Sequence, residues 1–179
     1  MAGESGVSRA ARNLIAFYLR LALGVDFLSA VADRFGLWGP PGAHNVTWGN
    51  FPRFINYTAQ VDPFASAHAA AVVAWVVTAL ELLFGALLIL GLFARATAFL
   101  SGILLAMFAV GMSVGTGAKS AFDASMFTAS AGAFALAALG SGAWSIDARK
   151  RKQRAAAQPP SPASTPASTG GEEERPSGG

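Results

Sequence analysis

Three ionisable side chains stand inside long apolar segments of this 179-residue chain: Arg20, Asp26 and Glu81. Glu81 interrupts the run TALELLFGALLILGLFAR, residues 78–95, which is about long enough to cross a bilayer. A charged side chain in hydrocarbon is costly, so it usually faces the interior of a helix bundle, where it pairs or serves a ligand or proton pathway. We therefore take these three residues as the candidates for buried polar or ligand-binding groups.

Helical spacing places Glu81 among small or polar neighbours, because Ala74, Thr78 and Gly85 share its face. Arg20 lies on a similar small-residue face. At ~1.5 Å per residue, Arg20 and Glu81 stand ~12 Å and ~18 Å from the cytoplasmic ends of their helices, a difference that an extended arginine spans. We expect the two to pair. Such a pair either only fixes how two helices dock or holds a proton or a polar head group.

Asp26 lies about 120° around the helix from Arg20, so the two residues do not share one narrow seam. It is either an unpaired acid lining a cavity or a water-exposed residue near the outer leaflet. Arg95 and Asp147 both fall at cytoplasmic helix ends. We predict that they form a structural charge pair.

Other kinds of chemistry find little support in the residues. The chain has no cysteine, which removes disulfides, thiolate metal sites and dithiol relays. Its two histidines, His44 and His68, stand outside the middle of any span, which argues against a haem held between them. No Ser/His/Asp set, phosphate loop or metal-ligand spacing occurs, so we predict neither catalytic residues nor a metal.

The composition indicates an all-α, membrane-embedded four-helix bundle. The chain is 53% hydrophobic and 13% charged, where a soluble domain carries about 25% charged residues. Four apolar blocks, each near the length of a membrane-spanning helix, cover residues 13–31, 65–93, 96–114 and 123–144. Together they predict a membrane domain over residues 13–148. Residues 1–12 precede it, and a basic collar with a Pro/Ser/Ala-rich tail, residues 149–179, is predicted to be disordered.

Residues 34–66 form the longest connection between the predicted spans. Glycines and prolines mark turns in its first half, and its aromatic residues are of the kind that settle at a membrane–water interface. From Phe51 the apolar spacing predicts a short amphipathic helix in that interface. The connection either seals the bundle or forms a lid over a cavity.

The distribution of basic residues predicts the orientation. Eight lysines and arginines close to the predicted spans fall on the side that carries both termini, namely Arg9, Arg12, Arg95, Arg149, Lys150, Arg151, Lys152 and Arg154. Three fall on the other side: Arg34, Arg53 and Lys119. We therefore expect both termini in the cytoplasm. The basic collar adjoins a span and is interpreted as a topology signal, not as a nucleic-acid site.

The first span contains Arg20-x3-Gly24-x2-Phe27. This pattern resembles the opening of the DoxX family of small four-helix membrane proteins, which usually continues through a glycine to a lysine. Val31 and Arg34 stand at those two positions. The glycine is therefore lost and the lysine is replaced by another basic residue.

Two further motifs carry the same resemblance. Glu81-x3-Gly85-x5-Gly91-x3-Arg95 is similar to the most recognisable block of the family, and GSGAWSID, residues 140–147, is similar to its closing motif. The resemblance implies an integral protein of the bacterial plasma membrane, associated with a redox partner and with quinone. Because the sequence has no thiol, flavin fingerprint or metal site, we expect no turnover by the chain alone. A small-molecule or proton-coupled carrier and a purely structural membrane protein are the alternatives.

Overall fold

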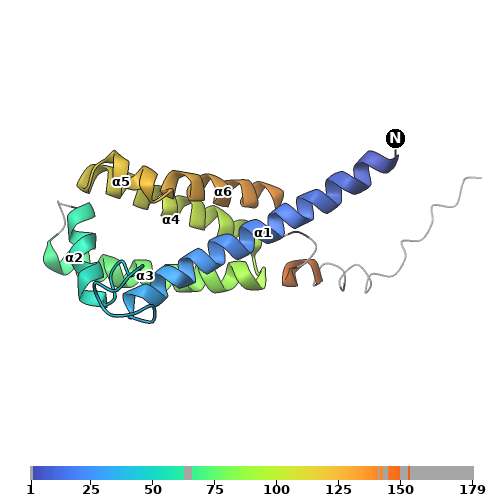
Figure 1. The fold of residues 1–179 in the computed structure, drawn as a ribbon. Coiled ribbons are helices and arrows are strands. Elements are labelled where there is room, and N and C mark those ends of the chain that lie inside the picture. Colours follow the sequence, from blue (N-terminus) through green and yellow to red (C-terminus); the bar gives the residue numbers. More distant parts are fainter. Residues whose placement is uncertain (1, 63–65, 141, 143–144, 150–152, 154–179) are drawn as a thin grey trace, which may run out of the picture.

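The computed structural model describes residues 2–62, 66–140, 142, 145–149 and 153 (Figure 1). These residues form helices and turns, with no strand among them. The helices are α1 (Ala2–Arg34), α2 (Phe51–Val61), α3 (Ala67–Leu90), α4 (Ala94–Gly115), α5 (Ala118–Asp123) and α6 (Met126–Leu139). The predicted all-α membrane fold is confirmed. The predicted tail lies outside the described residues, apart from residues 149 and 153.

Three helical segments are long and apolar enough to span a membrane: Ser8–Arg34, Ala67–Leu90 and Ala94–Gly115. The predicted fourth span, residues 123–144, contains a shorter helix, the 14-residue α6. A turn at Ser125, whose φ of 55° lies in the left-handed region, precedes α6 and separates it from α5. The expected count of four membrane-length helices is therefore not confirmed in the described part of the chain, although α6 packs along α4.

Helices α1 and α3 pack antiparallel through two glycines. A Cβ on Gly24 would lie 2.7 Å from Ile89 Cγ1 and 3.0 Å from the Gly85 carbonyl oxygen, and a Cβ on Gly85 would lie 3.0 Å from Leu28. Small residues let two backbones approach this closely inside a membrane. This close contact sets the register of the pair. Helix α1 also continues past the other helices at its N-terminal end (Figure 1).

Helices α4 and α6 form the second closely packed pair. Phe134 rests on Gly102, where an added Cβ would come within 2.8 Å of the ring, and the Ser130 hydroxyl donates to the Gly102 carbonyl over 2.9 Å. Large apolar side chains face outward from both pairs, among them Leu82 and Val110, which are more than half exposed. Such an outer surface suits contact with lipid.

Helix α2 bridges the two pairs at the end away from the N-terminus (Figure 1). Its first residue, Phe51, lies 4.1 Å from the Trp75 ring of α3, measured between centroids. Its last turn abuts α4, where a Cβ on Gly115 would fall 2.2 Å from the Gln60 carbonyl oxygen. Asp33 Oδ2 secures the preceding loop by accepting hydrogen bonds from the Thr47 and Trp48 N–H groups. The short helix predicted from Phe51 is confirmed.

Candidate ligand pocket

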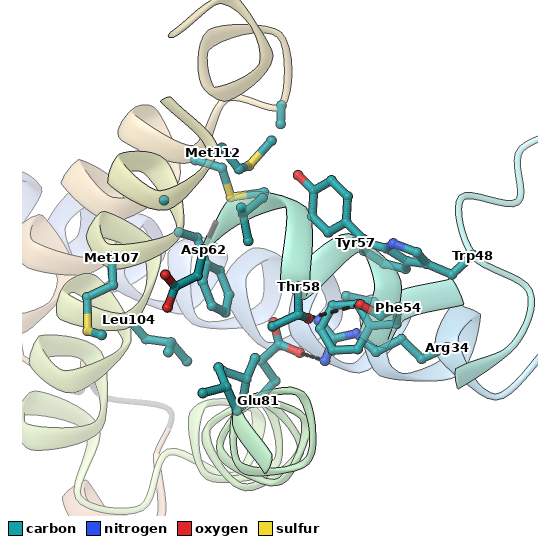
Figure 2. Close-up of a pocket in the computed structure, with 18 of the residues that line it drawn as sticks. Arg34, Trp48, Phe54, Tyr57, Thr58, Asp62, Glu81, Leu104, Met107 and Met112 are labelled. Atoms are coloured by element: carbon teal, nitrogen blue, oxygen red, sulfur yellow. Dashed lines mark hydrogen bonds and ion pairs between the residues drawn. The ribbon is translucent and has the colours of Figure 1, made fainter. Parts of the chain in front are cut away.

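A cavity of about 600 Å³ lies between the α1–α3 pair and the α4–α6 pair, next to α2. Most of its walls are apolar or aromatic. Figure 2 shows Phe54, Tyr57 and Trp48 on one side, Leu104 and Met107 on the other, and Arg34 with Glu81 between α1 and α3. Arg34 and Glu81 together form a polar end of the cavity, whose other walls are mostly apolar or aromatic, with Asp62 and Tyr57 as separate polar groups (Figure 2).

The polar end is a buried ion pair between Arg34 and Glu81, each 2% exposed. Arg34 Nη1 contacts Glu81 Oε2 and also donates to Thr78 Oγ1 over 2.8 Å. Thr78 Oγ1 in turn donates to the Ala74 carbonyl over 2.7 Å. A charge this deeply buried needs a partner of opposite sign, and here each residue supplies the other's.

Aromatic rings hold the guanidinium of Arg34 in place. Its central carbon lies 3.7 Å from the centroid of the Phe54 ring and 5.3 Å from that of Trp48, within the range of cation–π attraction. Arg34 Nε is buried and has no hydrogen-bond partner among the described residues. The site therefore retains one unsatisfied donor beside the cavity, and burial makes such a group costly to leave unpaired.

The predicted pairing of Arg20 with Glu81 is wrong. Arg20 Nε donates to the Leu88 carbonyl over 3.0 Å, and Nη2 makes a longer contact of 3.5 Å with the Ile89 carbonyl. These are among the last carbonyls of α3, which have no partner within the helix. Arg20 is buried as expected, but it caps the end of α3.

The expected pairing of Arg20 with Glu81 rested on the distance of each residue from the cytoplasmic end of its own helix, which does not give the register between the two helices. In the antiparallel register set by Gly24 and Gly85, Arg20 lies level with the end of α3, whereas Arg34 lies level with Thr78. Arg34 is also the last residue of α1, not a loop residue that marks topology. A sequence signal was present, because Arg20 and Arg34 belong to one stripe of α1 that continues through Gly24, Phe27 and Val31, all buried.

The sequence profile of the DoxX family matches residues 15–115, more than half of the chain. The chain belongs to the DoxX family. No curated protein and no solved structure matches it. The DoxX region includes α2, α3, α4 and all of α1 from Ile15 onward. It therefore contains every residue of the polar end, and of the cavity walls only Ala124 and Met126 lie outside it.

Asp26 does not lie in the cavity of this DoxX chain. Its side chain is exposed on α1, and it is not among the residues that line the pocket. The prediction that it lines a cavity is therefore wrong, because the stripe of α1 that faces the bundle passes through Gly24 and Phe27 instead. His44 and His68 are exposed as well.

Arg95 and Asp147 do not form an ion pair in the described part of this DoxX chain. Asp147 Oδ2 instead accepts a hydrogen bond from the Ala94 N–H over 3.0 Å, at the first residue of α4. A carboxylate there satisfies an unpaired amide and complements the helix dipole. Arg95 is exposed, with its guanidinium against Gly140. Asp147 is structural as predicted, but its partner is the backbone.

Proposed function

We propose that this protein is an accessory membrane subunit that holds a quinone-like lipid in the cavity beside α2 and serves a redox partner. One observation carries the proposal: an apolar cavity of about 600 Å³ reaches a buried Arg34–Glu81 pair that keeps a spare donor. Small-molecule sites are typically about 300–1,000 Å³, mostly apolar, with a few placed polar groups. The cavity meets this description.

The charge of the polar end favours a neutral head group. Arg34 and Glu81 cancel each other, so an anionic head would meet the Glu81 carboxylate and a cationic head would meet the guanidinium. A carbonyl oxygen, in contrast, carries no net charge and accepts a hydrogen bond from a guanidinium N–H. The rings of Phe54 and Trp48 offer stacking surfaces for a planar head. A quinone combines a planar ring, carbonyl oxygens and zero net charge.

The proposed role is binding and not turnover. Two-electron chemistry is usually carried by a cofactor, and this chain has no cysteine to form a thiol relay. In this proposal a partner protein exchanges electrons with the bound quinone, while the chain positions the quinone within the membrane. The purified protein alone is therefore expected to show no oxidoreductase activity.

Thermal unfolding of the purified protein in mild detergent tests the proposal. A short-chain quinone should raise the melting temperature, because a ligand that binds only the folded state stabilises it by about 2.7 kcal/mol at 100 times its Kd. A hydrocarbon with the same tail and no carbonyl should do much less. The double variant Arg34→Leu/Glu81→Leu should lose the shift, whereas Asp26→Asn, which alters an exposed residue of α1, should retain it. Equal responses to quinone and hydrocarbon would refute head-group recognition.

A second candidate is a carrier of a polar small molecule. Asp62, which is exposed, and Tyr57, which is half-buried, line the same cavity, so a solute from water would meet polar groups there. In this case a water-soluble metabolite, and not a quinone, would raise the melting temperature. Proton-coupled uptake into liposomes would then replace the redox role.

We further propose that both termini lie in the cytoplasm and that α2 lies at the outer face. The excess of lysine and arginine on the terminal side supports this orientation, and it persists when the buried Arg34 is left out of the count. A reporter fused after Gly179 should be active only in the cytoplasm, and one at Gly42 only outside. Exchanged compartments would reverse the orientation.

A further inference from the structure

We infer that the ligand enters the cavity sideways from the lipid, between α3 and α4, and that it is therefore a membrane-dissolved molecule whose tail extends into the bilayer. The inference rests on the proposed function for the ligand's head group. The opening itself rests on separate observations: exposed wall residues, the apolar surroundings of the opening, and the attachment of α2.

Three apolar residues of the membrane-length helices line the cavity and are also exposed on the outside of the protein. Val73 of α3 is 43% exposed, and Met107 and Val114 of α4 are 65% and 64% exposed. A side chain that lies on both a cavity wall and the outer surface marks a place where the cavity opens. All three belong to the halves of α3 and α4 that approach α2, so one opening lies between these halves; Thr47, Asp62 and Ala124, which are also exposed wall residues, lie outside these two helices.

The surroundings of this opening are apolar. Residues 72–77 of α3 read VVAWVV and residues 103–114 of α4 read ILLAMFAVGMSV, without an ionisable residue in either segment. Val76 and Val110 are also more than half exposed on the same two helices. Both helices are long and apolar enough to span the membrane. The opening therefore faces hydrocarbon, where only a lipid-soluble molecule reaches a high concentration.

Helix α2 is fastened on both sides of the cavity, which favours lateral entry over displacement of α2. Phe51 packs on Trp75 at 4.1 Å between centroids, and the last turn of α2 sits so close to α4 that a Cβ on Gly115 would overlap it. Thr58 and Phe54 are buried beneath the helix. Moving α2 aside would break these contacts, whereas lateral entry leaves them intact.

The path from the opening to the polar end suits a molecule with a head and a tail. Met107 stands at the opening and Met112 lies nearby on the cavity wall (Figure 2). Methionine side chains are flexible and adapt to apolar groups of different shape. With the head beside Arg34, the tail passes between α3 and α4 into the bilayer. The class of ligand is thus a neutral carbonyl head joined to a lipid tail.

The absence of cysteine allows a direct test in nanodiscs, in which single introduced cysteines are labelled with a bulky maleimide. Met107→Cys blocks the opening. Leu100→Cys is the matched control, because Leu100 is exposed on the same helix, at 48%, about two turns from Met107, and does not line the cavity. Thr47→Cys places the label at an exposed wall residue of the loop that precedes α2. Quinone association is followed by quenching of tryptophan fluorescence after rapid mixing.

Label at Met107→Cys should slow association on the order of tenfold or more, with little change for the label at Leu100→Cys or Thr47→Cys. Slowing only from Thr47→Cys, or equal rates for all three, would overturn lateral entry. Equilibrium titration of the unlabelled protein tests the proposed function separately. A nitroxide on Val77→Cys, a half-buried wall residue, tests the opening without any quinone: oxygen dissolved in lipid should relax it far more than a water-soluble nickel complex. The reverse preference would also overturn the inference.

Discussion

Arg20 and Arg34 occupy the same stripe of α1, are each 2% exposed, and yet have different surroundings. Arg20 donates to the carbonyls that end α3, at the end of the bundle where the helices converge. Arg34 pairs with Glu81, at the end where α2 separates the helix pairs and a cavity remains. The first arginine completes a helix end, whereas the second faces a space that a ligand can fill.

Packing around the two arginines explains this difference. At the Arg20 end, a Cβ on Gly91 would lie 2.6 Å from the Ser145 Cβ and 2.8 Å from Arg20 Nη1, so no space is left. At the Arg34 end the guanidinium is covered by aromatic rings on one side and borders the cavity. Burial of a charged side chain alone does not identify a binding site. A buried charge that borders an unfilled cavity and has an unsatisfied hydrogen-bond donor is a better indication of a binding site.

The largest expected effect tests the Arg34 end. Glu81→Leu leaves the Arg34 charge buried without its partner, and we expect a loss of about 3–5 kcal/mol in the free energy of unfolding. The double variant Arg34→Leu/Glu81→Leu should recover much of this loss. Arg20→Leu combined with Glu81→Leu should instead be additive within about 0.5 kcal/mol, because the two residues do not touch. Denaturant unfolding in detergent of the three single and two double variants measures both couplings. Strong coupling of Glu81 to Arg20 instead of Arg34 would invalidate the observed pairing.

The next effect tests the Arg20 end. Arg20→Met removes the hydrogen bonds to Leu88 and Ile89, and hydrogen bonds to charged groups contribute about 1.5–3 kcal/mol. We expect a loss of about 2–3 kcal/mol in stability with no change in quinone Kd, measured by fluorescence titration below the melting temperature. A large change in Kd would show that Arg20, too, serves the ligand.

A smaller effect tests the contact that separates the two ends. Gly24→Ala introduces a methyl group 2.7 Å from Ile89 and 3.0 Å from the Gly85 carbonyl, and overpacking of this kind costs about 1–3 kcal/mol. Gly132→Ala is the matched control on α6, because an added Cβ there would lie 3.7 Å from the Leu19 side chain, an ordinary van der Waals contact. That substitution should be neutral or slightly stabilising. Equal melting temperatures for both variants would show that the Gly24–Gly85 contact does not determine the register of α1 against α3.

The smallest effect concerns Tyr57 on the cavity wall. Burial raises the pKa of this phenol above its usual value. Above pH ~10 the unfolded chain loses the phenolic proton that the folded protein still holds, so Tyr57 makes stability fall as pH rises through that range. Tyr57→Phe should reduce this fall, and Tyr18→Phe, which alters a phenol 70% exposed, is the control. Identical alkaline unfolding curves for Tyr57→Phe and the unaltered protein would contradict the burial of the phenol.

Much of the fold was predictable because it follows from local properties of the chain. Apolar runs of sufficient length predict helices in a membrane, and the glycines and prolines of residues 34–66 predict a connection. The helix beginning at Phe51 and the burial of Arg20 and Glu81 were also predictable. The turn at Ser125 was not, because a serine in an apolar run carries no strong turn signal.

What the sequence by itself determined is that Arg20 and Glu81 would lie buried, since hydrocarbon excludes their charges. Only the tertiary structure decided which arginine meets Glu81. That choice depends on the register of α1 against α3, which is set where Gly24 meets Gly85. Arg20 bonds to Leu88, so a shift of about two helical turns would be needed to bring it to Glu81. The tertiary structure also decided that Asp26 points away from the bundle and that α2 leaves a cavity beside Arg34. These are contacts between segments distant in the chain, and no local pattern specifies them.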